Sequence, residues 1–195
     1  MIFRIDKRLA FPDPRLGDPD GLFAVGGDLS TDRLILAYSN GIFPWYAFRW
    51  ADEIHWYCPM DRFVIFPEEI HVSHSMRTLM NKDLYTVTIN RDFHSVITAC
   101  GQLRVGEEGA WLGKDMTEAY EELHRQGFAA SVEVWDGDRL AGGLYGVCLG
   151  RCFLGIAVST KYQQYCYNYN SHAVPLFVFN TILTVHHCLA AYTEQ

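Results

Sequence analysis

The sequence predicts an α+β protein. The chain has 195 residues, of which 49% are hydrophobic and 20% are charged, a composition typical of one globular domain or two small ones. A short apolar segment and one capped helix precede residue 60. Helix-period and strand-period patterns, including a tight antiparallel pair, follow from residue 84 onward.

The first elements lie in the segment GLFAVGGDLS, residues 21–30. Its apolar part predicts a strand that the glycine pair ends. Ser30 is then expected to cap a helix that runs through Tyr38, since its side-chain oxygen can accept a free N–H group of the first turn. Asn40-Gly41 supplies the left-handed residue that ends such a helix.

The string NGIFPW, residues 40–45, follows this helix directly, and the aromatic run extends to Trp50. One interpretation buries the whole run in the core. The other places it in a surface loop that lines a cleft, because loops generally run over the surface. The pattern alone leaves both interpretations open.

Two helices and a strand are predicted next. LYTVTIN alternates as a strand, and Asp92 is placed to cap the helix FHSVITACGQL. A second, amphipathic helix follows, with Met116, Tyr120 and Leu123 on one face, and Gly127 ends it.

Antiparallel strands complete the pattern. AASVEVW and RLAGGLYGVCLG are expected to pair around Asp136-Gly137, a strong hairpin signal, and CFLGIAV predicts one more strand. Gly142-Gly143 indicates a bulge or a close approach to a ligand. Strand, helix, helix and antiparallel meander is the order found in GNAT-type acyltransferases, and this order alone does not assign a reaction.

Charge and cysteine content restrict the functional classes. The net charge is −7, so any surface for nucleic acid must be local, and Arg77 with Lys82 forms one of the small basic clusters. None of the six cysteines forms a C-x-x-C pair, so we expect reduced thiols and no metal site. The sequence shows neither a membrane-spanning apolar segment nor a signal peptide, and we expect a cytoplasmic protein.

Several blocks carry a specific family resemblance: GLFAVGGDLS, AYSNGIFPW, HWYCPMDR, EAYEELHRQGFAASVEVW and LAGGLYGV. In this order and spacing, they resemble the leucyl/phenylalanyl-tRNA–protein transferase family over residues 11–155. The resemblance implies an aminoacyltransferase that moves leucine or phenylalanine from charged tRNA to proteins beginning with Arg or Lys. That reaction marks proteins for degradation by the N-degron route.

The same resemblance implies the architecture and the partners. It implies an N-terminal domain at residues 1–60 and a GNAT-like acyltransferase domain at residues 61–155. No metal, acetyl-CoA or other cofactor is expected, and the partners are aminoacyl-tRNA and the acceptor protein. We expect a monomer that does not associate with membranes.

Site residues are also implied by the resemblance. The site for the 3′-aminoacyl adenosine is expected to use Tyr38, Trp45, Trp111, Tyr120, Leu144 and Phe153. Aromatic rings suit an unpaired adenine, and an apolar hole suits a leucyl or phenylalanyl side chain. Leu144 stands where the family often has methionine. Taken without the family, Tyr120 is typical of a core residue on an amphipathic helix.

A basic region of the family falls on Arg77 and Lys82, which we expect to contact the tRNA acceptor stem. His74 and Thr78 occupy positions that are often basic in relatives. Because phosphate contacts supply most non-specific affinity, the sequence predicts weak or salt-sensitive tRNA binding.

The resemblance ends after residue 155, and residues 156–195 carry only Lys161 and Glu194 as charged residues. The Asp-Cys-Gln stretch that the family has near the reacting ester is absent, so no catalytic residue is assigned. We hypothesise that residues 156–195 are a frameshifted or replaced end, which leaves the GNAT-like domain incomplete. Glu133 is a conceivable substitute base, but the strand pattern favours a carboxylate on the solvent side.

Two other functions remain open. A small-molecule GNAT acetyltransferase needs a Q/R-x-x-G-x-G/A loop for coenzyme A, and RLAGGL at 139–144 is the nearest string, inside a predicted strand. A non-catalytic or defective product that at most binds the tRNA 3′ end is the other alternative.

Overall fold

The structure is a computed structural model, and it describes residues 2–17, 21–45, 53–62, 64–66, 69, 71–82, 84–102 and 113–160. The described residues form a mixed protein of helices and strands with two four-stranded sheets. The predicted α+β class is confirmed at this level. The chain divides into two compact units, the first made of Met1–Phe63 with Arg104–Phe128, and the second of Val64–Leu103 with Ala129–Gln195.

The first unit contains a sheet with strand order β1-β2-β4-β3, in which only the β1–β2 pair is parallel. Helices α1 and α4 belong to the same unit. Its elements are β1 (Phe3–Ile5), the 3-10 helix η1 (Pro14–Leu16), β2 (Leu22–Gly26), α1 (Thr31–Ser39), β3 (Phe43–Trp45), β4 (His55–Tyr57) and α4 (Lys114–Arg125).

Helix α1 begins and ends where the sequence predicts, but its first turn is capped differently. Ser30 is the N-cap residue, yet its hydroxyl makes no cap bond and instead donates to the Asp28 carboxylate at 2.5 Å. The expected capping bond is therefore wrong. At the other end Gly41 has a φ of 70°, its N–H donates to the Tyr38 carbonyl, and the N–H of Ile42 donates to that of Ala37. This pair of bonds is a Schellman motif, which requires a left-handed residue.

The FPW part of the aromatic run is a strand and not a loop. Phe43–Trp45 pairs antiparallel with His55–Tyr57, so that Pro44 lies opposite Trp56. A proline fits here because β3 is the edge strand of its sheet and needs no N–H on its outer side. The loop interpretation is therefore wrong for residues 43–45, and residues 46–50 lie outside the described part of the chain.

The core of the first unit is built around Trp56, which is completely buried. Its indole N–H donates to the Gly26 carbonyl at 2.8 Å, and the Phe11 ring meets it edge-on at 5.0 Å. A buried indole that both packs and finds an acceptor leaves no polar group unsatisfied on this side chain. Trp56 thus contacts both strand β2, through Gly26, and the N-terminal segment, through Phe11.

Arg33 lies on helix α1 and is unusually buried, with 1% of its surface exposed. Its Nη2 atom donates to the carbonyls of Asp6 and Arg8 at 3.1 Å and to the Asp28 carboxylate at 3.2 Å. Burying an arginine is tolerated only when the charge is compensated and hydrogen-bonded. The contacts hold the N-terminal segment against helix α1.

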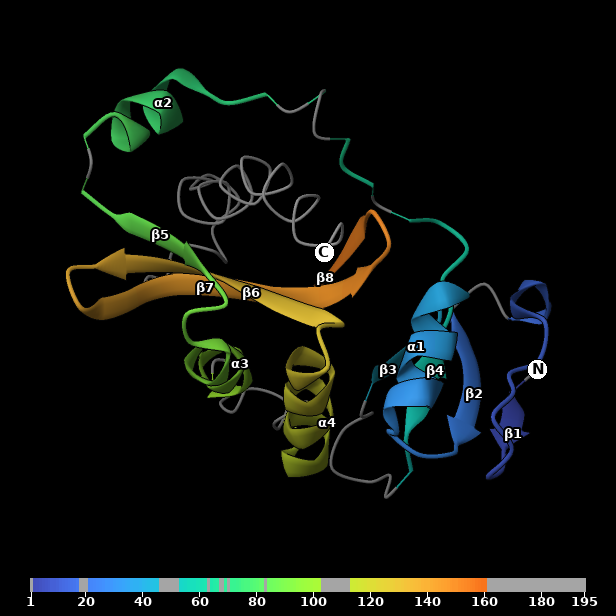
Figure 1. Ribbon diagram of the computed structural model, residues 1–195. Helices are drawn as coiled ribbons and strands as arrows, with labels where there is room; N and C mark the ends of the chain where they lie inside the picture. Colours follow the sequence, from blue (N-terminus) through green and yellow to red (C-terminus); the bar gives the residue numbers. More distant parts are fainter. Residues whose placement is uncertain are drawn as a thin grey trace. The chain divides into compact units, whose positions relative to one another are not determined.

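The second unit contains an antiparallel sheet with strand order β5-β6-β7-β8. Helix α3 covers one face of this sheet (Figure 1). The Phe93 and Tyr145 rings meet there at 5.8 Å between their centres. The elements of the second unit are α2 (His74–Met80), β5 (Thr86–Ile89), α3 (Phe93–Gln102), β6 (Ala129–Asp136), β7 (Arg139–Leu149) and β8 (Cys152–Thr160).

The predicted hairpin and the predicted bulge are both present. Strands β6 and β7 join through Gly137, with a φ of 61°, and Asp136 pairs with Arg139. The register shifts between Val134 and Trp135, next to Gly142 on the partner strand. A bulge of this kind bends the strand and increases its twist.

Candidate functional site

The clearest polar contact among the expected site residues joins Tyr38 and Tyr120. Their phenol oxygens lie 2.5 Å apart, and one donates to the other. Tyr38 comes from the last turn of α1 and Tyr120 from the middle of α4, and 7% and 0% of their surfaces are exposed. Burial raises the pKa of the Tyr120 phenol well above its usual value, so this hydroxyl stays protonated. The structure brings these two predicted residues together within the first unit.

The amphipathic pattern explains how α4 presents Tyr120. Met116, Tyr120 and Leu123 are buried, as the spacing predicts, and the helix ends at Gly127 with a φ of 83°. The face that holds Tyr120 is therefore the packed face of the helix. Tyr120 is therefore both a core residue and the hydrogen-bonding partner of Tyr38.

Trp45 lies in the same unit, on strand β3. Its ring centre is 6.2 Å from that of Phe43 and 6.1 Å from that of Tyr57. The three rings thus form a cluster on one face of the β3–β4 pair, with Phe43 and Tyr57 nearly parallel at 24°. Trp111, another expected site residue, lies outside the described part of the chain.

Tyr57 and Arg62 were not singled out from the sequence, although both belong to this cluster. The guanidinium of Arg62 lies 5.5 Å from the centre of the Phe43 ring. The sequence did contain a signal for Tyr57. It ends the segment HWY, and in the β3–β4 pair it lies opposite Phe43 and on the same face. Aromatic residues at that period on two paired strands predict a shared ring cluster.

Leu144 and Phe153 lie in the second unit, on neighbouring strands. Leu144 is 1% exposed on β7, where it pairs with Val132 of β6. Phe153 on β8 is partly exposed, and its ring lies over Gly146, where an added Cβ would come within 2.6 Å of Phe153 Cζ. The glycine therefore leaves the space that this ring occupies.

The two predicted tRNA contacts, Arg77 and Lys82, lie on and just after helix α2, and both are exposed. Within the ranges that the structure describes, neither makes an ion pair with a carboxylate. Thr78 does not add to this charge, and its hydroxyl donates to the His74 carbonyl at 2.9 Å.

Glu133 overturns an expectation. The strand pattern favours a solvent-side carboxylate, but Glu133 is 0% exposed. Its oxygens accept from the hydroxyls of Thr88 at 2.6 Å and Ser131 at 2.5 Å, and from the N–H groups of Arg91 at 3.3 Å and Asp92 at 3.4 Å. Four donors satisfy the carboxylate oxygens, which explains how this polar side chain is tolerated in the interior. A group enclosed in this way does not reach a substrate amine.

Among the described residues, no three His, Cys, Asp or Glu side chains are grouped so as to hold a metal ion. Within the same residues, no helix is both long and apolar enough to span a membrane.

Comparisons with known proteins give a consistent family. A sequence model described as leucyl/phenylalanyl-tRNA protein transferase matches residues 64–164, and the model of that protein's N-terminal domain matches residues 27–60. Strands β5–β8 and the helix that carries Tyr38 both fall within the matched ranges.

Individual relatives carry the same name, leucyl/phenylalanyl-tRNA–protein transferase. One from Anaeromyxobacter sp. (strain Fw109-5) is 49% identical over 155 residues, which are 79% of this chain and 65% of the relative. One from Desulforapulum autotrophicum is 48% identical over 79% of this chain and 67% of the relative. One from Pseudomonas fluorescens (strain Pf0-1) is 51% identical over 78% and 68%. The chain thus spans 65% of the length of the first of these relatives.

Proposed function

Because this chain belongs to the leucyl/phenylalanyl-tRNA–protein transferase family, we propose that it is an aminoacyltransferase. The reaction moves leucine or phenylalanine from charged tRNA to the α-amino group of proteins that begin with Arg or Lys. Those proteins then enter the N-degron route of degradation in the cytoplasm. The observation that carries the proposal is the match of family models over residues 27–60 and 64–164.

The reaction is the aminolysis of an ester. The free α-amine of the acceptor protein attacks the ester carbonyl, and a tetrahedral intermediate carrying an oxyanion forms. The C–O bond to the terminal ribose then breaks, the ribose hydroxyl takes up the proton that the amine loses, and a peptide bond remains. Such a reaction needs a held adenosine, an apolar pocket for the side chain and stabilisation of the oxyanion.

We assign the terminal adenosine and its amino acid to Tyr38, Trp45, Trp111, Tyr120, Leu144 and Phe153. The assignment of Tyr38 and Tyr120, both in the first unit, is supported by their buried contact. The paired hydroxyls provide a fixed hydrogen-bonding group beside the α1–β3 turn. Support for Leu144 comes from its burial on β7, which suits an apolar wall. The catalytic residue is unassigned.

We further propose that the second unit is the GNAT-like acyltransferase core. Its four antiparallel strands with α3 on one face are compatible with that fold. We keep residues 1–60 as the N-terminal domain, residues 61–155 as the GNAT-like domain and residues 156–195 as the atypical end. The protein is proposed to act as a monomer, with Arg77 and Lys82 contacting the acceptor stem.

A second candidate is a protein that binds the tRNA 3′ end without transferring the amino acid. The enclosed position of Glu133 favours it, because this was the one carboxylate considered as a substitute base. The acetyltransferase alternative has no such support, since RLAGGL lies within strand β7 and not in a loop before a helix.

The test is a transfer assay with the purified 195-residue chain. Labelled leucine on tRNA is offered to a peptide that begins with Arg, with a peptide beginning with Gly as the control. We expect label on the Arg peptide alone. Binding of charged tRNA without transfer by a folded chain would replace the proposal with the binding-only function, and binding of acetyl-CoA would replace it with the acetyltransferase.

A further inference from the structure

The ring cluster on strands β3 and β4 extends beyond Trp45. Phe43 and Trp45 alternate along β3, and Tyr57 lies opposite Phe43 on β4, so all three project from the same face. Each of the three residues is partly exposed. The opposite face carries Pro44 and Trp56, which are buried in the core. The ring cluster therefore lies on the face of the β3–β4 pair that is not packed into the core.

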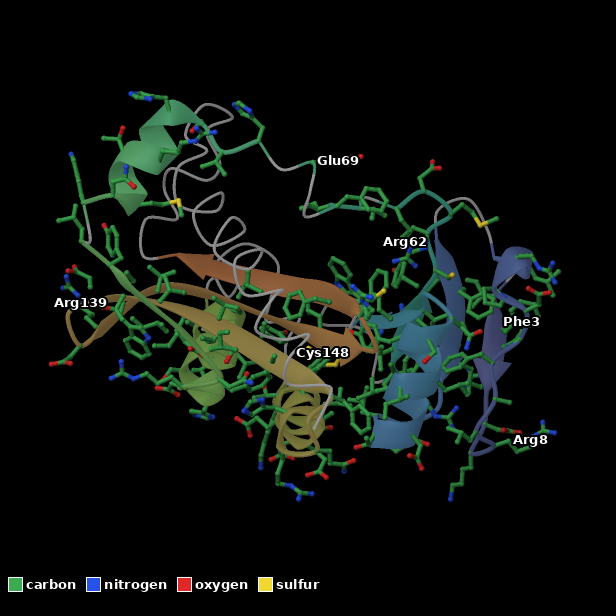
Figure 2. The ribbon with its side chains drawn as sticks, turned by 45° about the horizontal axis from the view of Figure 1, so that its top comes forward. Phe3, Arg8, Arg62, Glu69, Arg139 and Cys148 are labelled. Carbon is green, nitrogen blue, oxygen red and sulfur yellow. The ribbon has the colours of Figure 1, made fainter. Side chains whose placement is uncertain are left out.

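Arg62 completes this surface with a fixed positive charge. Its Nε donates to the Pro59 carbonyl at 3.1 Å, and its Nη2 donates to the Gly41 carbonyl. Arg62, which is labelled in Figure 2, is exposed. Its guanidinium lies over the Phe43 ring. Among the residues that the structure describes, no carboxylate pairs with it. Main-chain carbonyls therefore orient the Arg62 guanidinium.

Aromatic rings beside an oriented arginine are suited to single-stranded RNA. Proteins hold unpaired bases by stacking them on aromatic rings or guanidinium planes, and arginine also binds phosphate. We propose that Phe43, Tyr57 and Arg62 form a subsite for the nucleotide that immediately precedes the terminal adenosine of aminoacyl-tRNA. The base stacks on the rings, and Arg62 contacts its phosphate. This inference rests on the proposed function, in which Trp45 holds the terminal adenosine.

Geometry and charge both favour this occupant. The ring centre of Tyr57 is 6.1 Å from that of Trp45, so adjacent nucleotides of one strand can contact both residues. The acceptor protein would bring a positively charged Arg or Lys, which Arg62 repels. A ring cluster alone would attract such a cation, but Arg62 already occupies that position over Phe43. The arrangement therefore selects an anionic strand over a basic peptide.

The experiment compares two probes, adenosine 5′-monophosphate and the trinucleotide CCA, by calorimetric titration of the full chain. We expect the unaltered protein to bind CCA more tightly than the mononucleotide. In Tyr57→Leu, the affinity for CCA falls at least about fivefold more than the affinity for the mononucleotide, as expected for the loss of one stacked base. Tyr57→Phe, which keeps the ring, restores most of that loss.

Arg62→Gln tests the phosphate contact separately. We expect a weaker affinity for CCA and a salt dependence whose logarithmic slope is smaller by about 0.7, the value for one phosphate on a single strand. Arg151→Gln is the matched control, because Arg151 is also exposed and lies in the β7–β8 turn of the other unit. Circular dichroism of each variant establishes whether it is folded. If Tyr57→Leu is unfolded, the comparison of Arg62→Gln with Arg151→Gln decides the test.

Three results would overturn the subsite: equal affinity of the unaltered protein for the two probes, no binding of either, or an affinity for CCA that survives both Tyr57→Leu and Arg62→Gln. The transfer assay on the same preparations reports on the proposed function independently. Leucine transfer together with equal affinities rejects the subsite and leaves the aminoacyltransferase in place.

Discussion

Val96 leaves no room for a side chain at Gly143. A Cβ atom added to this glycine of strand β7 would lie 2.8 Å from Cγ2 of Val96 on helix α3 and 3.0 Å from the Val132 carbonyl oxygen. The glycine thus allows α3 to approach the sheet, and the close approach expected at Gly142-Gly143 is made by the protein itself.

Gly143→Ala is therefore expected to destabilise the protein by about 1–3 kcal/mol, the usual cost of overpacking a core. Denaturant unfolding monitored by fluorescence measures the change. Adding Val96→Ala should recover part of the loss, because it removes the clashing methyl groups. Gly155→Ala is the control, since a Cβ there meets nothing closer than 3.9 Å. Equal stability of the Gly143 and Gly155 variants would contradict the expectation.

Glu133→Gln is expected to cost about 2–3 kcal/mol of stability, although it preserves the size of the side chain. The amide places a donor where Glu133 accepts only from donors, so at least one buried donor loses its acceptor. Chemical denaturation measures the loss. Glu118→Gln, at an exposed residue paired with Lys114, should change stability by less than about 0.5 kcal/mol. A small effect at Glu133 would show that the donors find other partners.

A double-mutant cycle on Tyr38 and Tyr120 measures the coupling between helices α1 and α4. Tyr38→Phe and Tyr120→Phe each remove one hydroxyl of the pair, and the double variant removes both. We expect a coupling free energy of about 0.5–1.5 kcal/mol, because the two losses share one hydrogen bond. Strictly additive losses in thermal unfolding would mean that the hydroxyls act through other contacts.

The start of helix α3 should make stability depend on pH. Asp92 accepts from the hydroxyl of Ser95 at 2.6 Å and from its N–H at 3.0 Å, and these bonds lower the pKa of the Asp92 carboxyl below its ordinary 3.8. A lowered pKa in the folded state stabilises the protein above pH 3.8, and this contribution is lost as the pH falls through the folded-state pKa.

Asp92→Ala should thus cost about 1 kcal/mol near neutral pH and less below pH 3.8. Asp92→Asn, which keeps an acceptor for the cap, should cost less than Asp92→Ala and remove the titration. Unfolding free energies measured between pH 2 and pH 7 distinguish the three proteins. A penalty for Asp92→Ala that does not vary with pH would exclude the charged cap.

Local patterns predicted most of the regular elements. The cap at Asp92, the buried stripe of α4 and the turn at Gly137 each depend on residues close in sequence, and all three are present. Strand β3 was missed because Pro44 argues against a strand. Only the sheet order, which puts β3 at an edge, makes that residue acceptable.

Glu133 and the ring cluster depend on distant partners. Thr88, which supplies one of the hydroxyls that Glu133 accepts from, is 45 residues away in the chain. The strand pattern around Glu133 could not show this partner and favoured the solvent side for a carboxylate that is buried. Arg62 is 21 residues from the Gly41 carbonyl that orients it. Of the expected adenosine site, the sequence placed Tyr38 and Tyr120 on helix faces, but their contact spans 82 residues and required the fold.

The discontinuous make-up of the first unit affects how the protein is made. Its last piece, Arg104–Phe128, leaves the ribosome only after helix α3 and strand β5 of the second unit have been synthesised. Until α4 arrives, the side of α1 that carries Tyr38 lacks the partner that buries it. The first unit therefore cannot be completed before α4 has been synthesised, and slower translation after residue 63 would prolong the exposure of this side of α1 to chaperones.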